Sequence, residues 1–166
     1  MFKINFKKIL LNSGIISTIF LIDRLTKIYI LKIAEVKNAV DIYVNTYLNF
    51  YLIWNKGIAF GLLSFNETFI YNIITAIILL ITIAILIMII KNEGFKKYSL
   101  MFVLGGSLGN VFDRIYYSAV PDFIDFHIND FHWFVFNVAD IFITLGIVFL
   151  IFDEILINDK INEKIT

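Results

Sequence analysis

Four long apolar segments constrain the fold of this chain more than any other feature of its sequence. They are residues of about 9–31, 69–90, 98–115 and 136–157. Each is close to the length of about 20 mainly apolar residues that a helix needs to cross a bilayer. With 60% hydrophobic residues and a mean hydropathy of +0.85, the 166-residue chain is too apolar for a soluble domain of its size. The sequence therefore predicts one integral membrane domain over residues 1–166, mainly α-helical, with four transmembrane helices.

Composition excludes several classes of function. The formal net charge is zero and there is no basic tail, so nothing points to a nucleic-acid partner. Cysteine is absent, which excludes a disulfide scaffold and a thiol nucleophile. The two histidines, His127 and His132, lie outside any His-Glu-x-x-His pattern. They favour ordinary loop or interface positions over a zinc peptidase site.

Lysines near the helix ends predict the orientation of the chain. They precede the first span and fill the connection between the second and third, at Lys3, Lys7, Lys8, Lys91, Lys96 and Lys97. The positive-inside rule places these ends in the cytoplasm. Both termini are then cytoplasmic, and the loops of about residues 32–68 and 116–135 face outward. The first span carries Asp23, Arg24 and Lys27 where a small-residue cleavage site would stand, so we expect a retained membrane helix rather than a signal peptide.

The two outer loops differ from simple turns. Residues 40–54 are rich in β-branched and aromatic side chains with partial alternation, which predicts one or two short strands. We expect a small extracytoplasmic sheet on the outer leaflet, where the aromatic residues would suit the headgroup region. Residues 116–133 place aromatic side chains among polar ones, which favours an interfacial segment.

Polar residues inside the first span have two interpretations. Asp23 and Lys27 are four apart, hence on one helix face, and an ion pair would reduce the cost of both charges. The alternative is an anchor at the helix end, with Arg24 and Lys27 extending to the interface.

The third span combines small and strongly polar residues. Gly105 and Gly109 form a small-xxx-small pair that permits close helix packing. Asn110, Asp113 and Arg114 follow on roughly one side of the helix. A network of Arg114 with Asp113 or another carboxylate would satisfy the charges. It could serve structure alone or support a site.

Two aspartates, Asp122 and Asp140, border the fourth span, and Asn137 shares a helix face with Asp140. Carboxylates at or near membrane depth are costly and therefore indicate function. If the two carboxyls lie close together, repulsion and low polarity raise one pKa, and the pair shares a proton as in aspartic peptidases. The same acids could form a proton or ion pathway in a small transport protein. They could also be a helix cap and a hydrogen bond within the bundle.

Five motifs in chain order resemble the lipoprotein signal peptidase family, also called signal peptidase II. They are Asp23 to Lys27, Asn55-Lys56-Gly57-Ile58-Ala59-Phe60-Gly61, Gly105 to Arg114, Val120 to Ile124 and Phe136 to Asp140. The resemblance extends over all four spans and both outer loops, and five motifs in this order are strongly specific.

The resemblance implies an aspartic endopeptidase in the bacterial cytoplasmic (inner) membrane, with its active site toward the extracytoplasmic side. Such an enzyme removes the signal peptide from diacylglyceryl-modified prolipoproteins, on the amino side of the lipidated cysteine. The catalytic aspartates of the family match Asp122 and Asp140. Family positions that support the site or bind substrate match Asp23, Lys27, Asn55, Gly106, Asn110, Arg114, Asn137 and Ala139.

The resemblance also implies partners. We expect prolipoprotein substrate, membrane lipid and globomycin-type inhibitors to bind, and a monomer suffices. No metal or cofactor is required, because two acids supply both proton-transfer roles. Acyl chains held in the bilayer place the scissile bond near the outer surface, with Phe123, Phe126, Trp133 and Phe134 as candidates to line their path. Pro121, where the family more usually has another aliphatic residue, favours extended structure at Val120.

Overall fold

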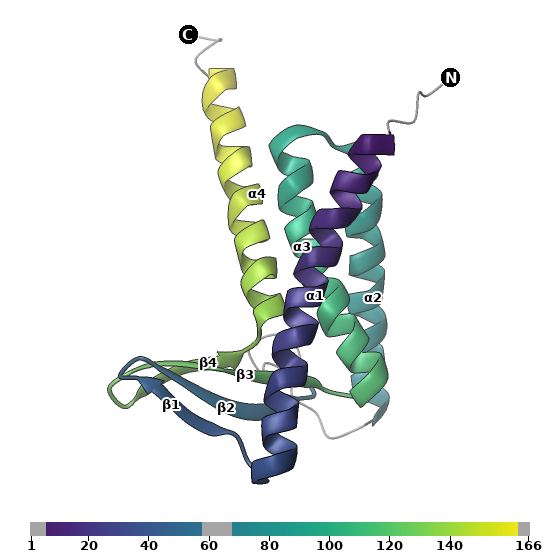
Figure 1. Ribbon diagram of the computed structural model, residues 1–166. Coiled ribbons are helices and arrows are strands. Elements are labelled where there is room, and N and C mark those ends of the chain that lie inside the picture. Colours follow the sequence, from purple (N-terminus) through teal and green to yellow (C-terminus); the bar gives the residue numbers. More distant parts are fainter. Residues whose placement is uncertain (1–5, 58–67, 163–166) are drawn as a thin grey trace.

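The computed structural model describes residues 6–57 and 68–162, and it combines a helix bundle with a sheet (Figure 1). The helices are α1 (Phe6–Lys37), α2 (Thr68–Lys91), α3 (Gly94–Tyr117) and α4 (Val138–Asn162). The strands are β1 (Asp41–Asn45), β2 (Leu48–Asn55), β3 (Val120–Ile128) and β4 (Phe131–Phe136). The predicted mainly α fold with a small sheet is therefore confirmed for this part of the chain.

The helices present apolar side chains outward. Two of the described helices, Phe6–Lys37 and Phe69–Lys91, are long and apolar enough to cross a membrane by length and composition. On α2 the outward residues include Ile77, Leu80, Ile83 and Ile90. Helices α3 and α4 have 24 and 25 residues, or roughly 36 Å each, so both have the length to span. On α3, Asn110, Asp113 and Arg114 lie toward the end that leads into β3, and on α4 Asp140 lies in the first turn, which follows β4.

Glycines let α3 pack closely against its neighbours. A Cβ on Gly105 would lie 2.8 Å from the Ile19 side chain of α1, and one on Gly106 would overlap the Ala139 carbonyl oxygen of α4. Farther along α4, a Cβ on Gly146 would lie 2.7 Å from the Ser99 carbonyl oxygen. The close packing predicted from the small-xxx-small pair is thus present, and it brings the polar face of α3 between α1 and α4.

The four strands form one antiparallel sheet in the order β1-β2-β3-β4. Two hairpins, residues 41–55 and 120–136, join through β2 and β3, with Phe50 opposite Ile124 and Asn55 opposite Val120. The strands predicted within residues 40–54 are confirmed. The sequence interpretation missed β3 and β4, because it treated residues 116–133 as an interfacial segment. The fourth apolar segment was also predicted to begin as helix at Phe136, which is instead the last residue of β4.

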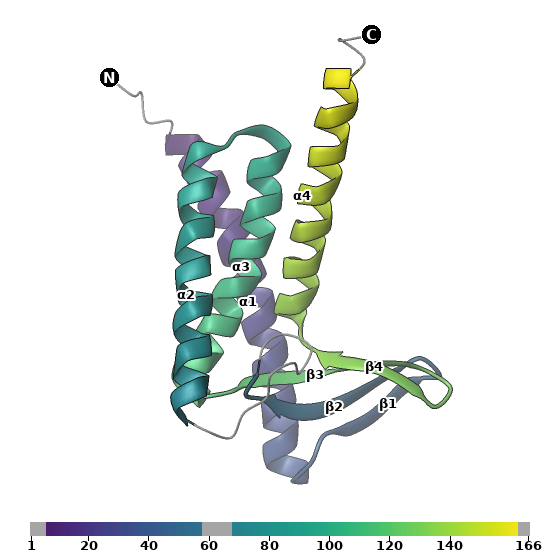
Figure 2. The ribbon, with the colours of Figure 1, turned by 180° about the vertical axis from the view of Figure 1, so that it is seen from behind.

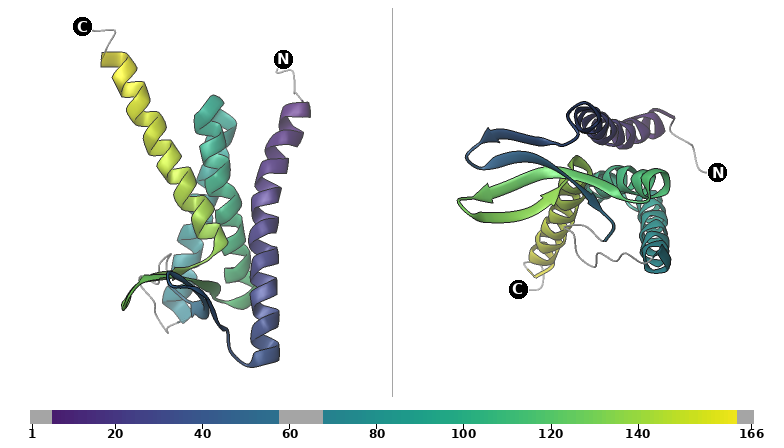
Figure 3. Two further views of the ribbon diagram at one scale, coloured as in Figure 1. Left: turned by 60° about the vertical axis from the view of Figure 1, so that its left-hand side comes forward. Right: turned by 90° about the horizontal axis from the view of Figure 1, so that it is seen from below.

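The sheet lies at one end of the bundle. The beginning of α1, the connection between α2 and α3, and the end of α4 lie at the opposite end (Figures 1 and 2). Figure 3 shows α4 diverging from α1 and α3 toward that opposite end, while the sheet extends to one side of the bundle. A cluster of Ile30, Val40 and Phe123 packs the sheet against α1. The start of α4 therefore lies where the bundle meets the sheet.

Candidate active site

Four buried charges join α1 to α3 beneath the sheet. The Lys27 ammonium lies 3.0 Å from the Asp23 carboxylate and 2.6 Å from that of Asp113. The Arg24 guanidinium lies 3.1 Å from Asp23 and 2.6 Å from Asp113. Two acids and two bases therefore balance, which is how charges are retained in a low-polarity interior. The predicted Asp23 to Lys27 pair is confirmed, and the anchor interpretation is wrong because Arg24 and Lys27 are only 7% and 0% exposed.

Arg114 does not belong to this network. Its Nη2 donates to the Gly57 carbonyl oxygen, and its guanidinium lies over the Tyr71 ring. The predicted pairing of Arg114 with Asp113 is therefore wrong. Adjacent residues project about 100° apart around a helix of 3.6 residues per turn, so the two side chains leave α3 in different directions. Arg114 instead holds the turn that follows β2. This turn belongs to the predicted motif Asn55 to Gly61, of which residues 58–61 lie outside the described residues.

Asp122 projects from β3 into a buried polar position and is 2% exposed. Its Oδ1 accepts a 2.5 Å hydrogen bond from Asn137 Nδ2, and its Oδ2 accepts one of 2.9 Å from Asn55 Nδ2. Asn55 is itself oriented, because its Oδ1 accepts from the Gly57 backbone N–H at 2.8 Å. The extended structure predicted at Val120 is confirmed, since β3 begins there.

Asp140 lies in the first turn of α4. Asn110 Nδ2 donates to its Oδ1 at 2.8 Å, and the Asn137 backbone N–H donates to its Oδ2 at 3.3 Å. In return, the Asp140 backbone N–H donates to Asn137 Oδ1 at 3.1 Å. These reciprocal bonds form a capping box, which satisfies donors at the helix start. The position of this carboxyl is thus set by where α4 begins.

Asn137 contacts both predicted catalytic acids. Its side-chain oxygen accepts from the Asp140 backbone and its side-chain nitrogen donates to the Asp122 carboxyl. The residue is fully buried. A single asparagine therefore couples β3 to α4 and holds the two carboxyls in one polar site.

Burial, and to a smaller extent the negative charge of Asp140, raises the pKa of the Asp122 carboxyl to about 7. Hydrogen bonds from Asn137 and Asn55 act in the opposite direction. Near neutral pH both protonation states of Asp122 are then populated. This is the condition that favours a group which gives and takes a proton in a reaction.

Behind the residues that contact the acids lie further predicted support residues, which are Asp23, Lys27, Gly106 and Ala139. Lys27 Nζ donates to Asn110 Oδ1 at 3.0 Å, which directs the Asn110 amide toward Asp140. The Ala139 backbone N–H donates to Asp23 Oδ1 at 3.0 Å, which brings the charged network to the start of α4. A carboxylate is favourable at this end of a helix. Gly106 lies against the Ala139 carbonyl.

An apolar cavity of about 340 Å³ adjoins Asp140, between β4 and α4. Its lining consists of Trp133, Phe134, Phe136, Asp140, Ile141, Thr144 and Leu145. Of the four aromatic residues expected near acyl chains, Trp133 and Phe134 line this cavity. Phe123 does not, because it is 3% exposed and packs between the sheet and α1.

Sequence reasoning missed two features of the site. The first is the Arg24 to Asp113 ion pair, which joins different helices and leaves no local spacing signal. The second is the capping box, which did have a signal. Asn137-Val138-Ala139-Asp140 before an apolar run has the spacing of a cap residue and its partner three positions later.

Comparison with known proteins shows the family of the chain. The family model for signal peptidase (SPase) II matches residues 15–156. The lipoprotein signal peptidase of Pelagibacter ubique (strain HTCC1062) is 56% identical over 163 residues, which cover 98% of each chain. That of Rickettsia bellii (strain OSU 85-389) is 39% identical over 168 residues, covering 97% of this chain and 85% of the relative. A solved bacterial membrane enzyme superposes with a TM-score of 0.69 at 27% identity, covering 91% of this chain and 90% of that one. The chain therefore belongs to the signal peptidase II family.

Proposed function

We propose that this protein removes the signal peptide from diacylglyceryl-modified prolipoproteins, with Asp122 and Asp140 as the catalytic pair of an aspartic endopeptidase. The observation that carries the assignment is the coupling of two buried carboxyls through Asn137 in a chain of this family. The relatives named above are lipoprotein signal peptidases, which supports the same substrate class. They give no support to the alternative of a transport protein.

The chemistry needs one protonated and one ionised carboxyl. The raised pKa of Asp122 supports it as the protonated partner near neutral pH. Asp140 takes a proton from water as the water oxygen attacks the scissile carbonyl carbon, and Asp122 donates its proton to the carbonyl oxygen. Collapse of the tetrahedral intermediate breaks the C–N bond as Asp140 gives its proton to the leaving amine and Asp122 takes back a proton from a hydroxyl of the intermediate. Two acids supply every proton transfer, so the mechanism includes no metal or cofactor.

The donors around the pair give each acid a fixed orientation. Each oxygen of Asp122 and of Asp140 accepts one N–H from Asn55, Asn110 or Asn137. Asn110 is in turn oriented by Lys27. We infer that Asp23, Lys27, Asn110, Asn137 and Ala139 position the acids, while Arg114 and Gly106 stabilise the surrounding turn and helix contact.

The proposed membrane arrangement has four spanning helices in a single domain of the bacterial inner membrane. Lys7, Lys8 and Lys91 lie at the end of the bundle away from the sheet, and Lys96 and Lys97 begin α3 there. The positive-inside rule would place this end, and both termini, in the cytoplasm. The sheet and the acids would then lie at the extracytoplasmic surface, where the scissile bond of a lipid-anchored substrate is expected.

Two apolar spaces support a lipid-bearing substrate. The cavity beside Asp140 is lined by Trp133 and Phe134. A larger groove of about 730 Å³ lies between α1, α3 and α4, with Leu11, Phe102 and Phe142 in its lining. We infer that the acyl chains and the apolar part of the signal peptide use these spaces. One copy of the chain contains both acids, so the proposal requires only a monomer, and globomycin-type inhibitors should compete for the same site.

Separate Asp122→Asn and Asp140→Asn variants test the proposal. Each should lower the rate of conversion of a diacylglyceryl prolipoprotein, followed by gel shift, by about 100-fold or more. Asp130→Asn is the matched control, because Asp130 is an exposed acid in the turn between β3 and β4. Near-normal processing by either catalytic variant, with unchanged thermal unfolding in detergent, would contradict the assignment.

A further inference from the structure

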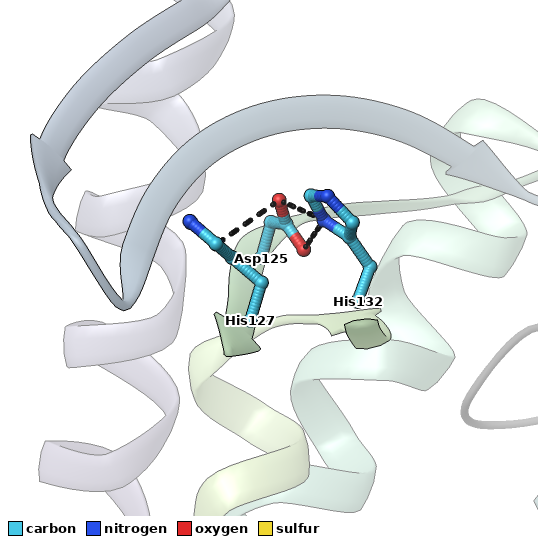
Figure 4. A group of neighbouring side chains, drawn as sticks. All are labelled: Asp125, His127 and His132. Atoms are coloured by element: carbon cyan, nitrogen blue, oxygen red, sulfur yellow. Dashed lines mark hydrogen bonds and ion pairs between the residues drawn. The ribbon is translucent and has the colours of Figure 1, made fainter. Parts of the chain in front are cut away.

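Three potential metal ligands meet on the β3–β4 hairpin (Figure 4). Asp125 and His127 lie two apart on β3, and His132 lies opposite His127 on β4. The Asp125 carboxylate is 2.9 Å from His132 Nδ1 and 3.7 Å from His127 Nδ1. One donor atom from each residue lies within 4.8 Å of the others. The strands, and not only the loop, therefore hold both imidazoles against one buried carboxylate.

Two buried polar atoms beside the cluster lack a hydrogen-bond partner. Within the described residues, His127 Nδ1 and Asn49 Oδ1 are buried without a hydrogen-bond partner. Asn49 is paired in register with Asp125, so both belong to the same part of the sheet. In the described part of the chain, the ion pairs of Asp125 are those with His127 and His132. Buried polar atoms without partners are costly, and a cation bound by the lone pair of His127 Nδ1 would relieve that cost.

A hollow gives access to the cluster from the surface of the sheet. It has a volume of about 420 Å³, and Asp125, His132 and Asn49 are among its lining residues. Asp41 of β1 lines the same hollow and adds a second carboxylate. His132 is half exposed, whereas His127 and Asp125 are largely buried. A hydrated ion therefore has a path to the ligands.

We propose that Asp125, His127 and His132 bind a divalent transition-metal ion of the zinc class. Zinc binds imidazole nitrogen and carboxylate oxygen at about 2.0–2.1 Å, so the ligand atoms of a tetrahedral site lie about 3.3 Å apart. The distances from the Asp125 carboxylate to His132 Nδ1 and His127 Nδ1, 2.9 and 3.7 Å, lie on either side of that value. Two imidazoles with one carboxylate suit zinc better than calcium or magnesium, which prefer oxygen ligands.

Three protein ligands leave a fourth position for water or for an oxygen ligand. The ion links β3 to β4, and β3 carries Asp122 three residues before Asp125. Its role is to fasten the hairpin, and it takes no part in the acid–base chemistry.

The composition of the chain makes this proposal easy to test. His127 and His132 are its only histidines and it has no cysteine. Any imidazole ligation in protein purified without a histidine tag must come from this cluster. Cobalt(II) titrated into the wild type in detergent should give saturable d–d absorption at one equivalent, and zinc should displace it. Zinc should also raise the melting temperature.

Matched variants separate a built site from surface binding. His132→Ala and Asp125→Asn should each weaken zinc affinity by about tenfold or more, since even outer partners of metal ligands cost that much. Asp130→Asn removes the same charge as Asp125→Asn from an exposed position of the same hairpin and should leave affinity unchanged. Metal-free melting curves report folding of each variant. Absence of saturable binding in the wild type, or equal affinity in His132→Ala and the wild type, would overturn the proposal.

Discussion

Asn137 and Asp140 hold each other at the start of α4, with the Asp140 N–H bonded to Asn137 Oδ1 at 3.1 Å and the Asn137 N–H bonded to Asp140 Oδ2 at 3.3 Å. A motif that elsewhere only starts a helix here fixes a proposed catalytic carboxyl. The second half of the Asn137 amide contacts the other acid, Asp122. Helix capping and catalytic geometry therefore depend on the same side chain.

Substitutions of Asn137 should separate these two roles. Asn137→Ala removes the cap and the donor to Asp122, so it should lower stability by about 1 kcal/mol and reduce processing. Asn137→Ser retains a capping oxygen but is too short to replace the amide donor. We expect it to restore most of the stability without restoring processing, as measured by thermal unfolding and gel shift. Equal recovery of both properties would show that the amide donor is unimportant.

The raised pKa of Asp122 predicts a pH dependence of stability. The folded protein keeps a proton on this carboxyl up to about pH 7, whereas the unfolded chain releases it near its ordinary pKa of 3.8. The folded state binds more protons between these values, so this group stabilises most at low pH. Its contribution decreases as pH rises toward 7.

Asp122→Asn should remove that contribution. Melting temperatures of wild type and variant, measured between about pH 4.5 and pH 7.5, should therefore converge or cross as the wild type loses stability with rising pH. Asp130→Asn should follow the wild-type curve, because Asp130 is exposed. Parallel curves for wild type and Asp122→Asn would contradict the raised pKa.

Local patterns in the sequence were enough to predict much of this structure. Apolar segments of spanning length located all four helices, and alternation of aromatic and β-branched residues located β1 and β2. The spacing of Asp23 and Lys27 was enough to predict their ion pair. Each of these signals lies within one helix or one hairpin, so it can be recognised from the local sequence alone.

Features that depend on two distant elements were not predictable in the same way. Strand β3 lacks a clear alternation of apolar and polar residues, because it is buried along most of its length. Its partner strand β2 lies about 70 residues earlier in the chain. Asp113 pairs with α1 and not with neighbouring Arg114, because their directions around α3 decide the partner. Only tertiary packing determines those contacts.

The buried charge network predicts a severe effect for Lys27→Met. Lys27 contacts Asp23, Asp113 and Asn110, and its removal leaves an excess negative charge in the interior. Breaking such a pair typically costs about 3–5 kcal/mol, so we expect a large decrease in melting temperature. Lys32→Met is the matched control, because Lys32 is an exposed lysine of the same helix. Adding Asp113→Asn to Lys27→Met should recover part of the loss, and a double variant less stable than Lys27→Met would argue against the network.

Two glycine substitutions test whether the contact between α3 and α4 positions the site. A Cβ on Gly106 would overlap the Ala139 carbonyl oxygen, so Gly106→Ala must push α4 away from α3 at the residue before Asp140. Gly14→Ala is the matched control, because no atom lies within 4 Å of a Cβ there. Alanine is favoured over glycine in a helix by about 1 kcal/mol, so Gly14→Ala should leave stability unchanged or raise it.

Gly106→Ala should lower both the melting temperature and the rate of prolipoprotein processing, and the processing rate should fall by the larger factor. Because Asp140 also receives its hydrogen bond from Asn110 on α3, a shift between these helices moves the acid from its donor. Wild-type processing by Gly106→Ala would show that this close contact does not position the catalytic pair.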